Sequence, residues 1–104
     1  MNKNILGTYK IVRGHCPKLP EDYTGEIEIK PQGLNYLITW KIGGKEYQGT
    51  GILNDSYLAI GYTRLGTSGL GVGLYCFSSD FNQAEGKYSD SSGTEQGLET
   101  LKKV

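Results

Sequence analysis

Four features of the sequence are candidates for catalysis or ligand binding: the pair His15-Cys16, the carboxylates Glu26 and Glu28, the glycine-rich run 66–71 and the serine-rich run 89–93. Neighbouring side chains in an extended chain point apart, so His15 is poorly placed to activate Cys16 as a nucleophile. The two glutamates alternate with isoleucines along a predicted strand, which puts both carboxylates on its solvent-facing side. Neither pair predicts a catalytic site.

The glycine-rich and serine-rich runs also fit loops better than catalysis. Residues 66–71 lack the lysine of a phosphate-binding loop and precede a predicted strand instead of a helix. Residues 89–93 have no histidine near them in the sequence, so the single histidine, His15, would have to serve any serine-based triad. We therefore expect a protein without enzyme activity.

Length and charge limit the class of protein. The 104 residues fit one domain, 1–104, which is large enough to bury a core without metal or disulfide support. Eleven basic and eleven acidic residues cancel, so there is no overall positive field to attract nucleic acid or an anionic membrane. No apolar run approaches the roughly 18 residues of a membrane-spanning helix. We expect neither nucleic-acid binding nor membrane insertion.

The cysteines and the first residue bear on the compartment. Cys16 and Cys76 match no metal-ligand spacing, and we predict no metal site and no cofactor. Cys76 falls inside a predicted strand, which favours a free, half-buried thiol, while a Cys16–Cys76 disulfide stays the alternative for a secreted protein. If Met1 is the native start, the protein is cytoplasmic; if a signal peptide was removed, it is extracytoplasmic.

The stretch 33–62 predicts three β-strands joined by two tight turns, and the rest of the fold is built around it. Apolar side chains occupy every second position of its first strand: Leu34, Tyr36, Ile38, Trp40 and Ile42. This period of two places them on one face, the predicted core face. Gly43-Gly44 and Asn54-Asp55 suit the left-handed backbone of tight turns, and they separate the predicted strands 45–53 and 56–63.

Five further strands are predicted at 7–13, 23–30, 70–78, 84–88 and 97–103. Leu98 and Leu101 are the apolar residues of the last one. Residues 1–6 are expected to be a loose polar start, and two prolines make residues 14–22 the longest loop. Apolar residues nowhere keep a helical period of 3.6, so no long helix is predicted.

Eight short strands with short sequential links predict an all-β, antiparallel, up-and-down meander. Closing the meander into a barrel would remove the two exposed edges of an open sheet. A two-sheet β-sandwich of the same strands is the alternative. The interior of an eight-stranded barrel is either filled by side chains or hollow enough for one small ligand.

The opening of the first strand, Gly7-Thr8-Tyr9, resembles the Gly-x-Trp motif of the calycins, the superfamily of lipocalins and avidins, with tyrosine in place of tryptophan. The predicted strand count and meander order are similar to theirs. The resemblance implies a barrel that is closed at one end and takes a small ligand at the other. It does not imply biotin binding, because the avidin site uses several tryptophans and this chain has only Trp40.

Loop lengths indicate which end would bind. In a meander the links from odd to even strands share one end, here the predicted links 14–22, 43–44, 64–69 and 89–96. All of these except 43–44 are long. Long loops mark the end better suited to binding. The residues predicted to form a site there are five aromatic ones and two that supply polar contacts: Trp40, Tyr47, Tyr62, Tyr88, Tyr23, Arg64 and His15.

Glycines on the same face as these rings leave two alternatives open. In a solid barrel the rings fill the space over the glycines, whereas in a hollow one the glycines leave an aromatic cavity. The hollow barrel predicts a non-catalytic module that binds a small apolar or aromatic molecule. The solid barrel predicts a protein-interaction module that uses its long loops or an outward patch such as Leu37, Tyr57 and Leu74.

Overall fold

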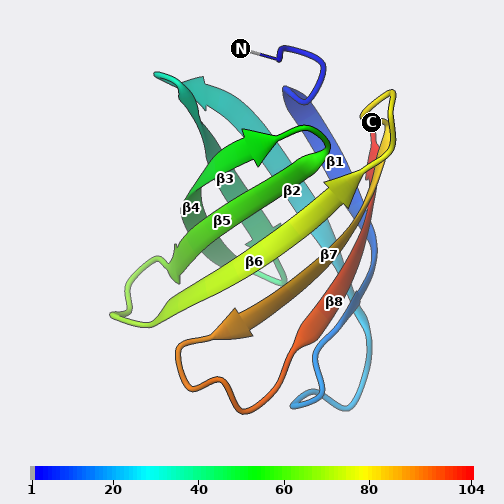
Figure 1. Cartoon of the computed structure of the whole chain (residues 1–104). Coiled ribbons are helices and arrows are strands. Elements are labelled where there is room, and N and C mark those ends of the chain that lie inside the picture. The colour runs from blue at the N-terminus through cyan, green and yellow to red at the C-terminus, as the bar shows by residue number, and fades with distance from the viewer. Residues whose placement is uncertain (1) are drawn as a thin grey trace.

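The computed structural model describes residues 2–104 as a closed, eight-stranded antiparallel β-barrel (Figure 1). Its strands are β1 (Gly7–His15), β2 (Tyr23–Gln32), β3 (Asn35–Ile42), β4 (Lys45–Asn54), β5 (Tyr57–Arg64), β6 (Leu70–Phe77), β7 (Gln83–Asp90) and β8 (Gly97–Lys103). Each strand pairs with the next, and β8 closes the barrel by pairing with β1. The predicted all-β barrel is confirmed, and the two-sheet sandwich is wrong. Residues 2–104 include no helix long and apolar enough to cross a membrane.

Both predicted turns of the central meander are present, but the second consists of Asp55 and Ser56, because Asn54 is the last residue of β4. Gly43, Gly44 and Asp55 have φ angles of 55°, 79° and 55°, which is the left-handed backbone expected there. Leu34 was expected in the core, but its side chain is 94% exposed. It lies with Gly33 in the turn that precedes β3, so it does not share the alternation of that strand.

The core fills the half of the barrel at the links β2–β3, β4–β5 and β6–β7. Tyr36, Ile38 and Trp40 are buried as predicted, and Ile42 is half-buried nearer the other end. Inward side chains from the remaining strands pack against them, mainly Tyr9, Ile11, Ile27, Ile29, Leu58, Ile60, Phe77, Ala84 and Leu101. This half of the barrel is solid.

The N-terminal segment closes the solid end, so the expectation of a loose polar start is wrong for residues 2–6; Met1 lies outside the described residues. The side chain of Ile5 is 0% exposed. The Tyr9 hydroxyl donates toward two carbonyl oxygens, that of Ile5 at 2.7 Å and that of Phe81 at 3.1 Å. Tyr36 donates to the Asn2 carbonyl at 3.0 Å. Burial of Ile5 and these hydrogen bonds hold the segment across the barrel.

A bulge in β1 changes which side chains face inward. The pairing of β1 shifts register after Ile11 with both β2 and β8, so that Gly14 faces inward while Arg13 and His15 face outward. Strict alternation from Ile11 would have pointed His15 into the barrel. The bulge therefore excludes His15 from the interior.

Both cysteines are free, so the disulfide alternative is wrong. Cys16 is half-buried just beyond the end of β1. Cys76 is exposed, not half-buried as expected, because it occupies an outward position of β6 opposite Tyr57.

Candidate functional site

A cavity of about 550 Å³ opens at the end of the barrel that carries the long loops. Each of six consecutive strands, β2 to β7, contributes one aromatic ring to its wall: Tyr23, Trp40, Tyr47, Tyr62, Tyr75 and Tyr88. Residues of the loops after β1 and β5, together with Gly43 and Glu95, form its rim. The barrel is thus solid at one end and hollow at the other.

Glycines on neighbouring strands seat the aromatic rings against the wall. Tyr62 pairs with Gly71 and Tyr88 pairs with Gly97 across adjacent strands. A Cβ atom added to either glycine would lie less than 3.0 Å from atoms of the facing ring. The rings cover the glycines, as predicted for a solid barrel. They lie along the wall, however, and leave the centre of the mouth open.

Tyr62 is the ring that joins the aromatic side chains of the wall. Its centroid lies 5.8 Å from that of Trp40, 6.2 Å from that of Tyr47 and 6.5 Å from that of Tyr88. The tilted and edge-to-face arrangements are those that aromatic pairs prefer. Burial raises the pKa of Tyr62 to about 12, so its hydroxyl is neutral at physiological pH.

A buried carboxylate, Glu99 of β8, completes the ring of strands around the cavity. Its residue is 4% exposed, and it lines the cavity together with Tyr75 and Trp40. Tyr75 donates a hydrogen bond to Oε1 at 2.5 Å and Tyr23 donates one to Oε2 at 2.5 Å. The indole N–H of Trp40 donates to the Tyr75 hydroxyl oxygen at 3.0 Å. Buried polar groups of this kind are stable only when hydrogen-bonded.

A second tyrosine extends this network. The hydroxyl oxygens of Tyr23 and Tyr88 lie 2.7 Å apart. A phenol has only one proton to donate. When Glu99 is ionised, Tyr23 donates its proton to Glu99, so Tyr88 donates to the Tyr23 oxygen. The hydrogen bonds run from Trp40 through Tyr75, Glu99 and Tyr23 to Tyr88, and they connect β3, β6, β8, β2 and β7.

Two glycines explain how the tyrosines reach this carboxylate. Glu99 pairs with Gly14 of β1 on one side and with Gly86 of β7 on the other. The ring of Tyr23 covers Gly14 and the ring of Tyr75 covers Gly86, because a Cβ at either glycine would overlap the ring. Each ring therefore crosses a strand that has no side chain in its path and brings its hydroxyl to Glu99.

The surroundings of Glu99 shift its pKa and the pKa values of its hydrogen-bond partners Tyr23 and Tyr75. Burial raises the pKa of Glu99 above its ordinary value, while the hydrogen bonds from Tyr23 and Tyr75 lower it and offset part of that rise. Burial and the nearby carboxylate raise the pKa of Tyr23 and of Tyr75. The tyrosines are therefore neutral donors at physiological pH.

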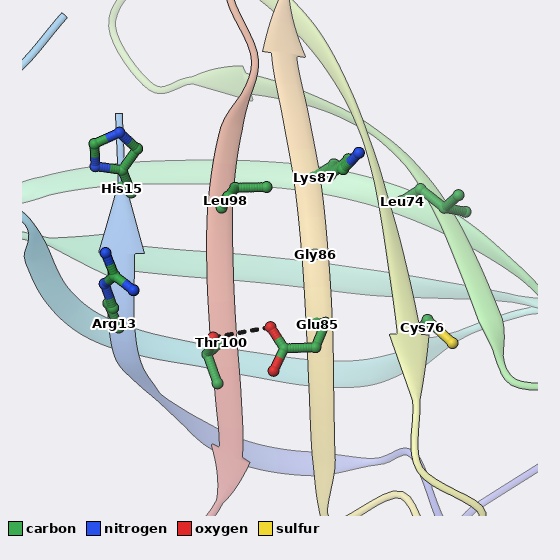
Figure 2. A pocket seen from close by; sticks show the side chains of 9 residues that line it. All are labelled: Arg13, His15, Leu74, Cys76, Glu85, Gly86, Lys87, Leu98 and Thr100. Atoms are coloured by element: carbon green, nitrogen blue, oxygen red, sulfur yellow. Dashed lines mark hydrogen bonds between the residues drawn. The ribbon is translucent and has the colours of Figure 1, made fainter. Parts of the chain in front are cut away.

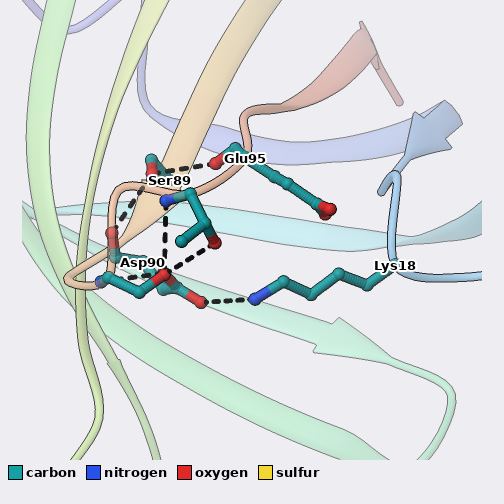
Figure 3. Close-up of polar contacts among 6 residues, drawn as sticks. Lys18, Ser89, Asp90 and Glu95 are labelled. Atoms are coloured by element: carbon teal, nitrogen blue, oxygen red, sulfur yellow. Dashed lines mark hydrogen bonds and ion pairs between the residues drawn. The ribbon is translucent and has the colours of Figure 1, made fainter.

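Polar contacts between loops shape the rim (Figure 3). Lys18, from the loop after β1, reaches across to Asp90 at the end of β7, with Nζ 3.2 Å from Oδ2. Ser89 donates to the Glu95 carbonyl oxygen at 2.9 Å within the loop that follows. Hydrogen bonds from Ser92 and Lys18 hold the pKa of Asp90 below its usual range. These contacts fix two of the long loops beside the cavity.

Six of the seven residues predicted for the site line this one cavity: Trp40, Tyr47, Tyr62, Tyr88, Tyr23 and Arg64. His15 does not. It lies on the outer wall, where its Nδ1 is 2.9 Å from Asp22 Oδ1, and Arg13 Nε is 2.7 Å from the other oxygen of that carboxylate.

Figure 2 shows the outer depression to which His15 and Arg13 belong, over β1, β8, β7 and β6. Its volume is about 400 Å³. Thr100 donates to Glu85 there at 2.9 Å. Most of the side chains that line it are exposed outward positions of the strands, so this depression is separate from the barrel interior.

Sequence reasoning missed Tyr75 and Glu99 as site residues. Tyr75 lies on the predicted strand 70–78 but is not among the residues predicted for the mouth. Glu99 was overlooked because Leu98 and Leu101 were taken together as the apolar residues of the last strand, although they are out of phase. Gly97, Glu99 and Leu101 are the inward set, and Leu98 is exposed. A period of two counted from Leu101 would have found Glu99.

The cavity can surround an apolar or aromatic body with ring faces and can accept hydrogen bonds at Glu99. Across the described chain, no three His, Cys, Asp or Glu side chains gather in a way that could hold a metal ion. No model of a known protein family matches this chain, and no curated protein matches it in sequence.

Proposed function

We propose that this protein is a non-catalytic binding module that holds one small apolar or aromatic molecule in the mouth cavity of a calycin-like barrel. The observation that carries the proposal is the cavity of about 550 Å³ walled by six aromatic rings. Its volume falls within the range of about 300–1,000 Å³ typical of small-molecule sites. The rings would supply most of the contact area, and the polar groups would set the orientation of the ligand.

The two ends of the barrel support the calycin-like arrangement. Tyr9, which stands where the Gly-x-Trp motif has tryptophan, is buried at the closed end and bonded to the carbonyl of Ile5. The long loops surround the open end, where the cavity lies. A barrel with this division can bind a ligand at its mouth without disturbing the packed core.

Trp40 provides the test, because it is the only tryptophan and lines the cavity. Titration with the neutral, polarity-sensitive dye prodan, and with a panel of flat aromatic ligands, should change its fluorescence saturably. Tyr62→Ala and Tyr47→Ala should weaken binding while the circular dichroism stays that of a β-barrel. Tyr57→Ala, on the outer wall, is the matched control and should bind as the wild type does. Absence of saturable binding across the panel would reject the proposal.

The location of the site is tested separately by substitutions in the turns at the closed end. Changes at residues 33–34 or 55–56 should leave prodan affinity unchanged, because these turns lie at the opposite end from the cavity. Binding that is lost on these changes but survives Tyr62→Ala would place the ligand elsewhere.

A second candidate function is protein binding through the outer wall of β5 and β6. The outward-facing residues of β5 and β6 carry no charge. Two of them, Val72 and Leu70, are 64% and 65% exposed. Tyr57 and Leu74 of the predicted patch lie there, whereas Leu37 lies on β3 and is half-buried. Native mass spectrometry of protein purified from its own host separates the candidates: a retained small molecule supports the first, and a retained protein chain supports the second.

A further inference from the structure

Glu99 is the one charged residue buried among residues 2–104, and it has no positively charged partner there. Its hydrogen-bond donors are the neutral phenols of Tyr23 and Tyr75. A buried charge without an opposite charge is costly, even when hydrogen bonds reduce the cost. When it is ionised, Glu99 is therefore a buried negative charge with no opposite charge beside it among the described residues.

The carboxylate is available to a molecule in the cavity. Glu99 lines the same cavity as the six rings. Each carboxylate oxygen accepts more than one hydrogen bond, and each is bonded to only one tyrosine. Acceptor capacity therefore remains for a donor on the ligand.

The charged groups near the cavity do not neutralise Glu99. Lys18 is paired with Asp90 at the rim, and Lys45, Arg64 and Glu95 line the mouth without an ion pair to Glu99 in the described chain. The groups that face Glu99 from β2, β6 and β7 are the hydroxyls of Tyr23, Tyr75 and Tyr88, all neutral, and β3 contributes the indole of Trp40. From β1 the paired residue is Gly14, which has no side chain.

The surrounding aromatic rings also favour a positively charged group in the cavity. The faces of tryptophan and tyrosine rings attract cations, most strongly where water is excluded. Trp40, Tyr62 and Tyr88 line the same cavity as Glu99, and the ring of Tyr62 lies beside the other two. Ring faces and the carboxylate would thus act on a positive charge together.

We propose that the ligand is a flat organic cation whose protonated nitrogen group, an ammonium or amidinium, binds Glu99 while its aromatic body packs among the rings. This inference rests on the proposed function and names the class of molecule that the cavity takes. The positive charge of the ligand compensates the negative charge of Glu99, which no basic side chain of the described chain does. The N–H groups of the ligand form charge-assisted hydrogen bonds with the carboxylate.

The experiment compares three probes of nearly equal shape and different charge: 2-naphthamidine, which is a cation, neutral 2-naphthamide and anionic 2-naphthoate. Isothermal titration calorimetry with the full chain at pH 8 gives a Kd for each. We expect the amidinium to bind at least about tenfold more tightly than the amide, since charge-assisted hydrogen bonds are the stronger ones, and the carboxylate to bind most weakly.

Two variants assign the preference to Glu99. In Glu99→Gln the ratio of the amide Kd to the amidinium Kd should fall to about one, since the charge is removed. In the matched control Glu85→Gln, which removes a carboxylate from the outer face of the neighbouring strand, the ratio should be unchanged. Retention of the full ratio in a folded Glu99→Gln variant would overturn the proposal.

A wild-type measurement covers the case in which Glu99→Gln does not fold. Lowering the pH protonates Glu99, while the amidinium itself stays charged. The amidinium should therefore lose affinity, whereas the neutral amide should not. Equal affinity of the amide and the amidinium, or tighter binding of the naphthoate, would overturn the proposed ligand class but leave the proposed function standing. Absence of binding by all three probes would overturn the ligand class, and the titration with neutral prodan then decides the function independently.

Discussion

The ring of Tyr75 covers Gly86 on the neighbouring strand, directly beside Glu99. Tyr75 pairs with Gly86 across β6 and β7, and Gly86 pairs with Glu99 across β7 and β8. Tyr23 and Gly14 repeat this arrangement on the other side of the carboxylate. The absence of a side chain at two positions is therefore what allows two tyrosines to bind one buried acid.

Replacing Gly86 by alanine should disturb the site and the fold together. The added Cβ would lie less than 3.0 Å from Tyr75 ring atoms, and overpacking of this kind costs about 1–3 kcal/mol. The displaced ring should also lose its hydrogen bond to Glu99. Urea denaturation measures the loss of stability, and Trp40 fluorescence reports the movement of the Tyr75 hydroxyl. Gly61→Ala is the control, because its nearest neighbour would be 4.0 Å away; equal effects at both positions would refute the role of the ring.

Removal of the tyrosine hydroxyls should destabilise the ionised carboxylate. Tyr75→Phe or Tyr23→Phe leaves one oxygen of Glu99 without its donor, and an unsatisfied buried group costs about 1–3 kcal/mol, more when it is charged. The cost in the free energy of unfolding should be larger at pH 8 than at pH 4, where the acid is protonated. Tyr57→Phe, at an exposed site, should change little. A cost that is the same at both pH values would mean that Glu99 is neutral throughout.

The pH dependence of stability should reveal the raised pKa of Glu99. Its ordinary pKa is 4.5, and burial raises the folded value above this. Between these two pKa values the folded protein binds more protons than the unfolded chain, so the contribution of Glu99 to stability falls as the pH rises. The difference in the free energy of unfolding, wild type minus Glu99→Gln, should therefore decrease from pH 4 to pH 8.

This difference cancels the titration of groups common to both proteins, such as Asp22 and Asp90, whose pKa values are lowered by their own partners. Urea denaturation at several pH values provides the measurement. A difference that increases with pH would show that the hydrogen bonds from tyrosine outweigh burial and hold the pKa of Glu99 below its ordinary value.

The sequence was sufficient for the fold because alternation along each strand is a local property. The period of two from Tyr36 to Trp40 placed the core face correctly, and the turn residues Gly43 and Asp55 marked hairpins that the structure contains. Connectivity of the meander then determined which loops share an end. That end is where the cavity lies, which is why Trp40 and Tyr62 were grouped correctly.

The errors concern positions decided by contacts between distant strands. The bulge after Ile11 depends on pairing with both neighbours of β1, so the outward position of His15 could not be obtained from its own strand. Alternation from Leu101 places Glu99 on the inward face, but a carboxylate in isolation is expected to face solvent, and its hydrogen-bond donors come from β2 and β6. Ile5 is buried by the barrel end that it closes, although the three residues before it, 2–4, are polar.

Trp40 should be the residue of the mouth whose loss costs most. Trp40→Ala removes a buried ring and the donor to Tyr75, and substitutions of this size cost about 3–5 kcal/mol. Thermal unfolding followed by circular dichroism measures the effect. Ile52→Ala, on the outer wall and 65% exposed, should cost less than about 0.5 kcal/mol. A melting temperature unchanged by Trp40→Ala would contradict the inward assignment of this face.

The closed end should contribute to stability independently of the ligand site. Ile5→Ala removes a fully buried side chain where the N-terminal segment crosses the barrel, and such truncations cost about 2–5 kcal/mol. The cavity is lined by residues of the opposite end, so prodan affinity of the folded Ile5→Ala variant should equal that of the wild type. Urea denaturation and prodan titration of one preparation give both values. An unchanged stability would show that residues 2–6 do not hold the closed end, and a weakened affinity would show that the two ends are coupled through the core.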